Sequence, residues 1–256
     1  MAQSAAKVIA ASGLLKDGFS FQTGAGGASL AAAQFLKEIM LKEGVQGSFG
    51  LGGITGYMVD MLQAGCFRNL MDVQCFDLKA VESIRNDPRH QEISALQYAS
   101  PSSKSAVVDS LDVVILGATE IDTDFNVNVH TDSNGYIMGG SGGHSDTAAG
   151  AKLSMIIAPM FRARLPIVTE RVQCISTPGK DIDVLVTQGG IAVNPNRGDL
   201  REKLTAAGLP VVDIRELKER TERITGTPRP INKGDQVVAE VISRDGELLD
   251  KIYRVG

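Results

Sequence analysis

The 256-residue sequence is long enough for one large α/β domain or two small ones, and its 43% apolar and 22% charged residues are typical of a globular protein. Its formal net charge of −4 argues against nucleic acid as the main partner, because phosphate binding usually leaves a basic surface. No apolar run approaches the roughly 18 residues of a membrane span and no secretory signal is evident, so we expect a cytoplasmic protein without a membrane partner. Cys66, Cys75 and Cys174 are an odd set without CxxC spacing, which indicates neither a disulfide framework nor a metal site.

The first half of the chain alternates helix-like and strand-like segments. Residues 2–15 have helical composition. Three rounds of strand and helix follow, the first two with glycines between strand and helix. The strands are predicted at 19–23, 47–51 and 73–76 and the helices at 29–42, 57–63 and 78–86. A further predicted helix at 102–111 leads into an apolar strand at 113–116.

The second half continues this alternation and ends differently. Strands are predicted at 155–158, 166–169 and 183–187, and helices at 145–154, 196–207 and 214–223. Residues 237–243 and 248–255 flank an Asp-Gly turn, which predicts a β-hairpin. Pro228 and Pro230 mark a connector. We therefore expect an α/β domain over residues 1–227, with a connector and hairpin over 228–256 packed on the same domain.

Strands that alternate with helices predict an α/β fold built on an open, mostly parallel sheet with helices on both faces. Ligands of such sheets bind at the carboxyl ends of the strands. Glycine pairs fall at three predicted strand ends, 26–27, 52–53 and 189–190, and residues 139–143 contain four glycines just before a helix. Glycines at these positions let backbone N–H groups approach a ligand closely. Chemistry is therefore expected around residues 117–152.

Several other site types fit the residues poorly. Residues 24–29 are superficially similar to a dinucleotide fingerprint, but Ser29 stands at the sixth position, and there is no Walker sequence. No G-x-S-x-G supplies a hydrolytic nucleophile. His90 and His130 lie in polar stretches and are predicted at the surface. Asp146 follows His144 at a predicted helix start, where it either caps the helix or contacts a substrate.

Two motifs carry a family resemblance. Residues 142–151, GGHSDTAAGA, resemble the G-G-x-x-D-x-x-x-G-A motif of CoA transferases, and residues 176–193 resemble the strand and turn D-x-x-V-T-x-x-G-x-A of the same superfamily. More closely, residues 49–56 (FGLGGITG) and 73–77 (VQCFD) are similar to the carboxyl-terminal half of the citrate lyase alpha subunit. This resemblance spans essentially the whole chain and implies the CoA transferase (NagB/RpiA-like) fold.

The resemblance also implies an activity. Alpha subunits of this family are citrate:acetyl-ACP transferases, which exchange acetate for citrate on the thioester of an acyl carrier protein or CoA. Implied substrates and partners are citrate, acetate, acetyl-CoA and the beta and gamma (acyl carrier) subunits, within an oligomer. No tightly bound cofactor is expected, because the CoA or phosphopantetheine-type thioester is a substrate. Family members are about twice this length, so a second half is expected to complete the site.

Covalent CoA transferases place a nucleophilic glutamate in the loop that residues 50–56 occupy here, and these residues contain no carboxylate. Direct transfer is therefore implied. A substrate carboxylate is ionised at neutral pH and needs no general base, so the protein has to hold two acyl groups together and stabilise an oxyanion. The expected oxyanion contacts are Gly52 and Gly53, and the expected substrate contacts are Gly24, Gly26, Gly27, Asn128, Gly140, Gly142, Gly143, His144 and Asp146. Asn128 alternatively pairs only within its strand.

Three alternatives to this assignment stay open. The chain could belong to another acyl-CoA:carboxylate CoA transferase, or it could be a non-catalytic half that binds an acyl-CoA or a carrier arm. A sugar-phosphate isomerase on the same general fold would need a carboxylate base within residues 50–56, so it is disfavoured.

Overall fold

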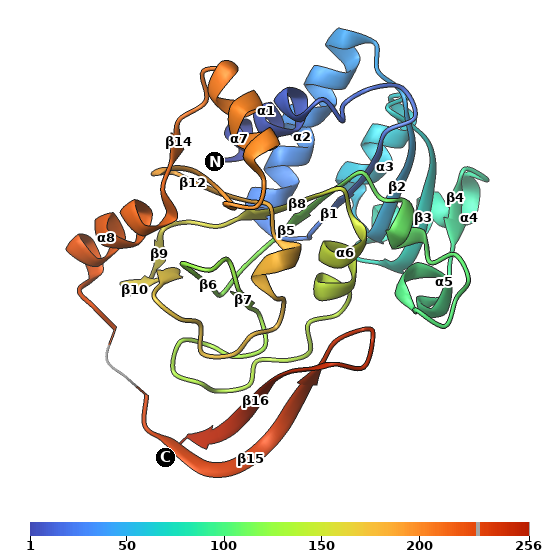
Figure 1. Ribbon diagram of the computed structural model, residues 1–256. Coiled ribbons are helices and arrows are strands. Elements are labelled where there is room, and N and C mark those ends of the chain that lie inside the picture. The colour runs from blue at the N-terminus through green and yellow to red at the C-terminus, as the bar shows by residue number, and fades with distance from the viewer. Residues whose placement is uncertain (229–230, 256) are drawn as a thin grey trace.

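The computed structural model describes residues 1–228 and 231–255. Its framework is a nine-stranded sheet in the order β14-β13-β12-β8-β5-β1-β2-β3-β4 (Figure 1). Neighbouring strands are parallel except β12 and β13, which confirms the predicted mostly parallel sheet. The strands of this sheet are β1 (Ser20–Thr23), β2 (Gly47–Ile54), β3 (Phe67–Cys75), β4 (His90–Glu92), β5 (Val113–Leu116), β8 (Leu153–Ile157), β12 (Val184–Thr187), β13 (Gly190–Val193) and β14 (Val211–Val212).

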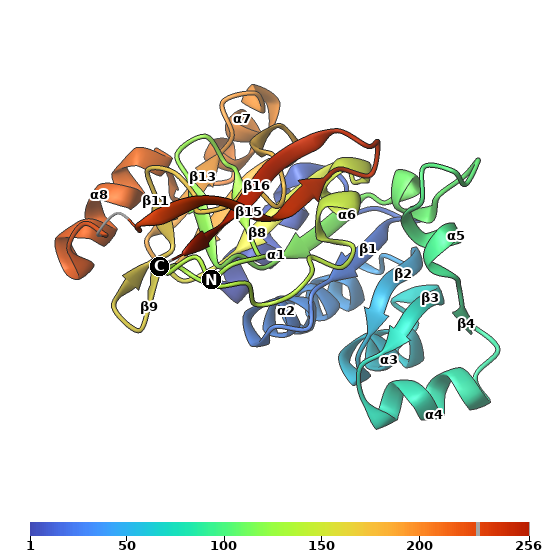
Figure 2. The same cartoon turned by 90° about the horizontal axis from the view of Figure 1, so that it is seen from below.

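Two hydrophobic cores form because alternate side chains of each strand point to opposite faces of the sheet. Val113 and Ile115 of β5 belong to one core, and Val114 and Leu116 belong to the other. The first core is covered by α1 (Ala2–Ser12), α2 (Gly27–Glu43), α3 (Gly56–Gln63), α4 (Leu78–Asn86) and α7 (Gly198–Ala206). The second is covered by α5 (Ala95–Ala99), α6 (His144–Gly150) and α8 (Ile214–Thr225). Helices on both faces are thereby confirmed (Figures 1 and 2).

Short strands build a further layer over the second core. They form a three-stranded sheet of β11 (Val168–Thr169), β6 (Glu120–Asp122) and β7 (Val127–Asn128), and a hairpin of β9 (Phe161–Arg162) and β10 (Leu165–Pro166). The buried side chains of Ile121, Phe125, Val127 and Val168 fill the space between this layer and the main sheet. The single strand predicted at 166–169 is thus two short strands in separate sheets.

The predicted carboxyl-terminal hairpin is confirmed as β15 (Lys233–Ile242) and β16 (Leu248–Val255). In Figure 1 it lies on the side of the molecule opposite α1, α2 and α7. It contacts the rest of the chain through a small cluster of Cys174, Val241 and Ile252, and through Asp250, whose Oδ2 accepts a hydrogen bond from the backbone N–H of Ile175 at 2.8 Å. The division of the chain at residue 227 stays a prediction.

Several predicted boundaries are wrong, and the strand predicted at 73–76 is part of β3, which already begins at Phe67 and ends at Cys75. Instead of a helix at 102–111, only a 3₁₀ turn forms over Val107–Ser110. Just before it, Oγ of Ser100 accepts a hydrogen bond from the backbone N–H of Ser102 at 3.2 Å, a local bond of the kind that competes with a helix. The helix predicted at 145–154 ends at Gly150, where the chain passes so close to this turn that a Cβ would lie 2.5 Å from the carbonyl oxygen of Val108. Gly52 and Gly53 lie within β2 and not in a loop after it.

His90 was predicted at the surface and is buried instead. It lies on the edge strand β4, where Nε2 is 3.1 Å from Oδ2 of Asp72 and Nδ1 is 2.9 Å from Oγ of Ser83. His130 is half-buried, with Nδ1 2.6 Å from Oγ of Ser176. Neighbouring polar side chains hydrogen-bond both nitrogens of His90 and Nδ1 of His130, and such partners are not evident from the polarity of the local sequence. Within the described ranges, no helix combines the length and apolar character needed to cross a bilayer.

Candidate functional site

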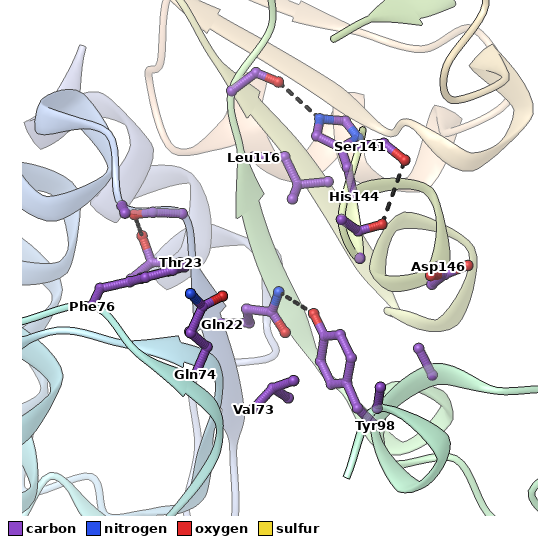
Figure 3. A pocket seen from close by; sticks show the side chains of 18 residues that line it. Gln22, Thr23, Val73, Gln74, Phe76, Tyr98, Leu116, Ser141, His144 and Asp146 are labelled. Atoms are coloured by element: carbon purple, nitrogen blue, oxygen red, sulfur yellow. Dashed lines mark hydrogen bonds between the residues drawn. The ribbon is translucent and has the colours of Figure 1, made fainter. Parts of the chain in front are cut away.

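A cavity of about 550 Å³ opens at the carboxyl ends of β1, β2, β3 and β5, where ligands of parallel sheets bind (Figure 3). Its walls come from segments distant in sequence: the end of β1, the β2–β3 pair, helix α5, the end of β5 and the start of α6. The residues that line it are Gln22, Thr23, Gly24, Ala25, Gly53, Val73, Gln74, Phe76, Ala95, Tyr98, Ala99, Leu116, Gly117, Ser141, Gly142, Gly143, His144 and Asp146.

The cavity brings together six of the eleven residues predicted for the site, namely Gly24, Gly53, Gly142, Gly143, His144 and Asp146. The other glycines lie just beyond its walls. Gly26 and Gly27 are exposed at the start of α2, and Gly140 is exposed in the loop before α6. Roles for these three in substrate binding stay predictions.

Asn128 does not line the cavity, and the structure assigns its amide to the fold. The side chain is fully buried; Nδ2 donates to Oε2 of Glu120 at 3.0 Å and to Oγ1 of Thr131 at 2.9 Å. Its Oδ1 accepts from the backbone N–H groups of His130 and Thr131, each at 3.1 Å. The amide is thus engaged by Glu120 of β6 and by residues that follow β7, so its pairing is not confined to its own strand. A contact of Asn128 with a substrate carboxylate stays a prediction.

Gly52 and Gly53 accommodate side chains of the cavity wall. The pairing of β2 with β3 shifts register between them, and Gly52 has a φ of 106°, a conformation that side chains rarely adopt. A Cβ at Gly52 would lie 2.8 Å from Cδ of Gln22, and one at Gly53 would lie 2.0 Å from Cε2 of Phe76. Their role as oxyanion donors stays a prediction. The geometry shows that both also have to be glycine for Gln22 and Phe76 to take their places.

His144 fastens the glycine-rich segment to the end of β5. Its Nε2 lies 2.8 Å from the carbonyl oxygen of Gly117, which can only accept, so this nitrogen carries the proton. Nδ1 then accepts from Oγ1 of Thr177 at 2.8 Å. Burial lowers the pKa of His144 to about 4, so the ring is neutral at pH 7. With both nitrogens engaged, His144 positions the loop and has no free lone pair for a general base.

This burial predicts a pH dependence of stability. The unfolded chain binds a proton at this histidine below about pH 6.5, whereas the folded ring stays neutral down to about pH 4. Stability is therefore lost as pH falls through this window, by roughly 3 kcal/mol in total from this group. We expect urea denaturation from pH 7 to 4.5 to show a steeper loss for the unmodified chain than for His144→Gln. Parallel pH profiles of the two proteins would contradict the assignment.

Asp146 is the carboxylate of the cavity. It is half-buried in the first turn of α6, and burial raises its pKa. The residue at the N-cap position is Gly143, so the alternative in which Asp146 caps the helix is wrong. Within the part of the chain that the structure describes, none of the residues lining the cavity is Lys or Arg. The cavity surface is therefore neutral apart from one acid.

Sequence reasoning missed several lining residues, above all Gln22, Phe76 and Tyr98. Gln22 and Phe76 fall in predicted strands next to loops, and their positions at strand ends are a signal that could have indicated them. Tyr98 does not lie at a strand end, and the helix α5 that carries it has only five residues, too few for a clear helical pattern. A Ser94–Gln97 capping box marks the start of α5 and was the cue in the sequence.

Comparison with known proteins gives consistent matches. The family model described as citrate lyase, alpha subunit (CitF), matches residues 1–255. A citrate lyase alpha chain from Klebsiella pneumoniae is 54% identical over 255 residues, which cover 100% of this chain and 50% of the relative. The chain thus spans about half the length of the curated relatives it matches.

Solved structures agree with this result. The alpha subunit of citrate lyase from Streptococcus mutans in complex with citrate superposes with a TM-score of 0.97 at 49% identity, covering 100% of this chain and 50% of that one. A 4-hydroxybutyrate CoA-transferase from Porphyromonas gingivalis aligns over 87% of this chain and 55% of its own, with a TM-score of 0.56 and 19% identity. At that identity the likeness shows the fold alone, and it confirms the predicted CoA transferase fold.

Proposed function

The chain belongs to the citrate lyase alpha-subunit family, and from this premise we propose that it forms one half of a citrate:acetyl-carrier transferase. The observation that carries the proposal is the cavity at the carboxyl ends of β1, β2, β3 and β5, in a backbone that superposes on a citrate-bound relative with a TM-score of 0.97. A volume of about 550 Å³ is within the range of sites for small molecules.

The proposed chemistry needs no metal or bound cofactor. A carboxylate oxygen of citrate attacks the carbonyl carbon of the acetyl thioester, and the tetrahedral oxyanion collapses to a citryl-acetyl anhydride and the carrier thiolate. The thiolate then attacks the citryl carbonyl carbon and expels acetate, which leaves the citryl thioester. Citrate is ionised at neutral pH, so His144, whose two nitrogens are engaged, is not required as a base. The protein contributes by holding both acyl groups together and stabilising the oxyanion.

The charge of the cavity supports a site that is completed by other residues. Citrate is a polyanion, and burying its carboxylates without cations or hydrogen-bond donors is costly. The described lining offers Asp146 and no Lys or Arg, so the positive charge for citrate has to come from outside these lining residues. The part of the alpha subunit that this chain does not cover is the proposed source. The beta subunit and the gamma subunit, which carries the acyl arm, are the proposed partners.

Isotope exchange tests the proposal directly. The chain is mixed with acetyl-CoA and carbon-13 citrate, with and without the remaining half of the alpha subunit added in trans, and thioesters are identified by mass spectrometry. We expect labelled citryl thioester only when both halves are present, and none when the chain is omitted. Label on the protein that hydroxylamine releases would contradict direct transfer. Binding of acetyl-CoA without exchange in any mixture would favour a non-catalytic binding half.

A further inference from the structure

A buried polar pair forms part of the cavity wall and has no role in the reaction as described so far. Gln22, at the end of β1, donates from Nε2 to the hydroxyl oxygen of Tyr98 on α5 at 2.8 Å. Figure 3 shows this bond crossing from the sheet to the helix beside the cavity. Both side chains are more than nine-tenths buried, with exposed fractions of 7% and 8%. The pair joins two walls of the site.

The pair has unused hydrogen-bonding capacity. A tyrosine hydroxyl that accepts one hydrogen bond still has its own proton to donate. In the described part of the chain, the hydroxyl of Tyr98 accepts the hydrogen bond from Gln22 and donates none. Oε1 of Gln22 is also buried there without a hydrogen-bond partner. Buried polar groups are normally satisfied, so an unused donor and acceptor at the wall of a cavity indicate a ligand that supplies the missing partners.

The surrounding backbone is shaped to admit this pair. A Cβ at Gly52 would lie 2.8 Å from Cδ of Gln22, and a Cβ at Gly143 would lie 2.5 Å from Cε1 and 2.6 Å from the hydroxyl oxygen of Tyr98. Gly143 has ordinary backbone angles, φ −85° and ψ 19°, which other residues also adopt. Glycine is needed at this position because a side chain would collide with Tyr98. Two of the glycines predicted for the site therefore border this pair.

We propose that Tyr98 is a substrate-contacting donor, whose hydroxyl proton forms a hydrogen bond with an acyl oxygen in the cavity, and that Gln22 is the positioning residue that turns this proton toward the ligand. The inference rests on the proposed function, which supplies the acyl ligand. By occupying a lone pair of the phenol oxygen, the amide of Gln22 directs the proton away from itself. The acyl oxygen is either the thioester carbonyl oxygen or a carboxylate oxygen of citrate.

The environment suits a neutral donor. Burial raises the pKa of Tyr98 to about 12, so the hydroxyl keeps its proton throughout the physiological range. A hydrogen bond in a site shielded from water is stronger than one in water, and it strengthens as negative charge develops on the acceptor. This donor supplements the backbone N–H groups predicted to contact the oxyanion.

Binding measurements on the chain reconstituted with the remaining half of the alpha subunit test the proposal. Titration calorimetry with acetyl-CoA and, separately, with citrate is expected to show about tenfold weaker binding of one ligand to Tyr98→Phe, which corresponds to about 1.4 kcal/mol. Loss with acetyl-CoA places the donor on the thioester carbonyl oxygen, and loss with citrate places it on a carboxylate. The control Tyr136→Phe removes the hydroxyl of an exposed tyrosine outside the cavity and is expected to bind like the unmodified chain.

A second variant tests whether Gln22 orients the hydroxyl proton of Tyr98 or only supports the packing of its ring. In Gln22→Glu a hydrogen bond between the two side chains is retained, but its direction is reversed. The Tyr98 hydroxyl donates to the carboxylate and no longer has its proton available for the ligand. We therefore expect Gln22→Glu to bind as weakly as Tyr98→Phe while unfolding at a similar temperature to the unmodified chain.

Equal binding of both ligands by Tyr98→Phe and the unmodified chain would overturn the proposal. If the unmodified reconstituted subunit binds ligand but the exchange experiment gives no citryl thioester, the proposed function fails and the inference survives. Binding of neither ligand by the reconstituted subunit overturns both.

Discussion

Replacing Gly143 by alanine is expected to lower citrate exchange by the reconstituted subunit by roughly 10- to 100-fold, equivalent to the 1–3 kcal/mol that overpacking typically costs. The new Cβ would lie 2.5 Å from the ring of Tyr98, closer than real Cβ contacts. The ring is 8% exposed and bonded to Gln22, so it has little room to retreat. Either Tyr98 turns into the cavity or the start of α6 moves, and the second response displaces His144 with it.

Gly139→Ala is the matched control for this substitution, because it adds the same methyl group to the same glycine-rich segment at a position outside the predicted substrate contacts. In the described structure nothing lies within 4 Å of a Cβ at Gly139, and its φ is not in the left-handed region. The control is therefore expected to exchange citrate like the unmodified chain. Steady-state rates with acetyl-CoA and citrate, together with unfolding temperatures, provide the comparison. Equal losses of exchange rate in both variants would contradict this explanation. They would show that the segment excludes any added side chain, whether or not it contacts Tyr98.

Replacing Gly179 by alanine is expected to destabilise the chain by about 3 kcal/mol or more, the upper range for overpacking a tight site. A Cβ there would lie 1.9 Å from the carbonyl oxygen of Asp124, which is backbone and has no rotamer to change. The segment is also held on both sides: the N–H of Gly179 donates to Oδ1 of Asn126 at 2.9 Å, and its carbonyl accepts from Nδ2 of Asn194 at 2.8 Å. Relief of the clash would break these bonds.

Gly198→Ala provides the control for stability. Gly198 begins α7, and a Cβ added there meets nothing within 4 Å in the described structure, so alanine is expected to be neutral or slightly stabilising. Urea denaturation midpoints at pH 7 measure both changes. Because Thr177 lies two residues before Gly179 and bonds to His144, the Gly179 variant should also bind acetyl-CoA more weakly than the control. Matching midpoints for Gly179→Ala and Gly198→Ala would refute the packing argument.

Local signals predicted the framework of this fold well. The apolar run at 113–116 and residues 184–187 of the strand predicted at 183–187 are buried strands, because strands covered on both faces of a sheet are rich in apolar residues. The Asp-Gly turn between two alternating segments is a hairpin, as its sequence indicates. Predictions failed where a boundary depends on a distant contact. α6 ends at Gly150, where the turn at 107–110 lies so close that a Cβ would meet the carbonyl oxygen of Val108. The sequence near Gly150 does not indicate which distant segment lies there.

For the site, the sequence by itself determined the glycine-rich segment 139–143, the strand-end location and, through its motifs, the family. Glycine content and motif spacing are local properties, so they can be read without coordinates. Only the tertiary structure decided which side chains share the cavity. It withdrew Asn128 into a hydrogen-bond network, engaged both nitrogens of His144, and brought Tyr98 of a five-residue helix against Gln22 of β1, 76 positions away in sequence. Such contacts are set by how the sheet and its helices pack, and residues far apart in the chain do not reveal that packing in their local pattern.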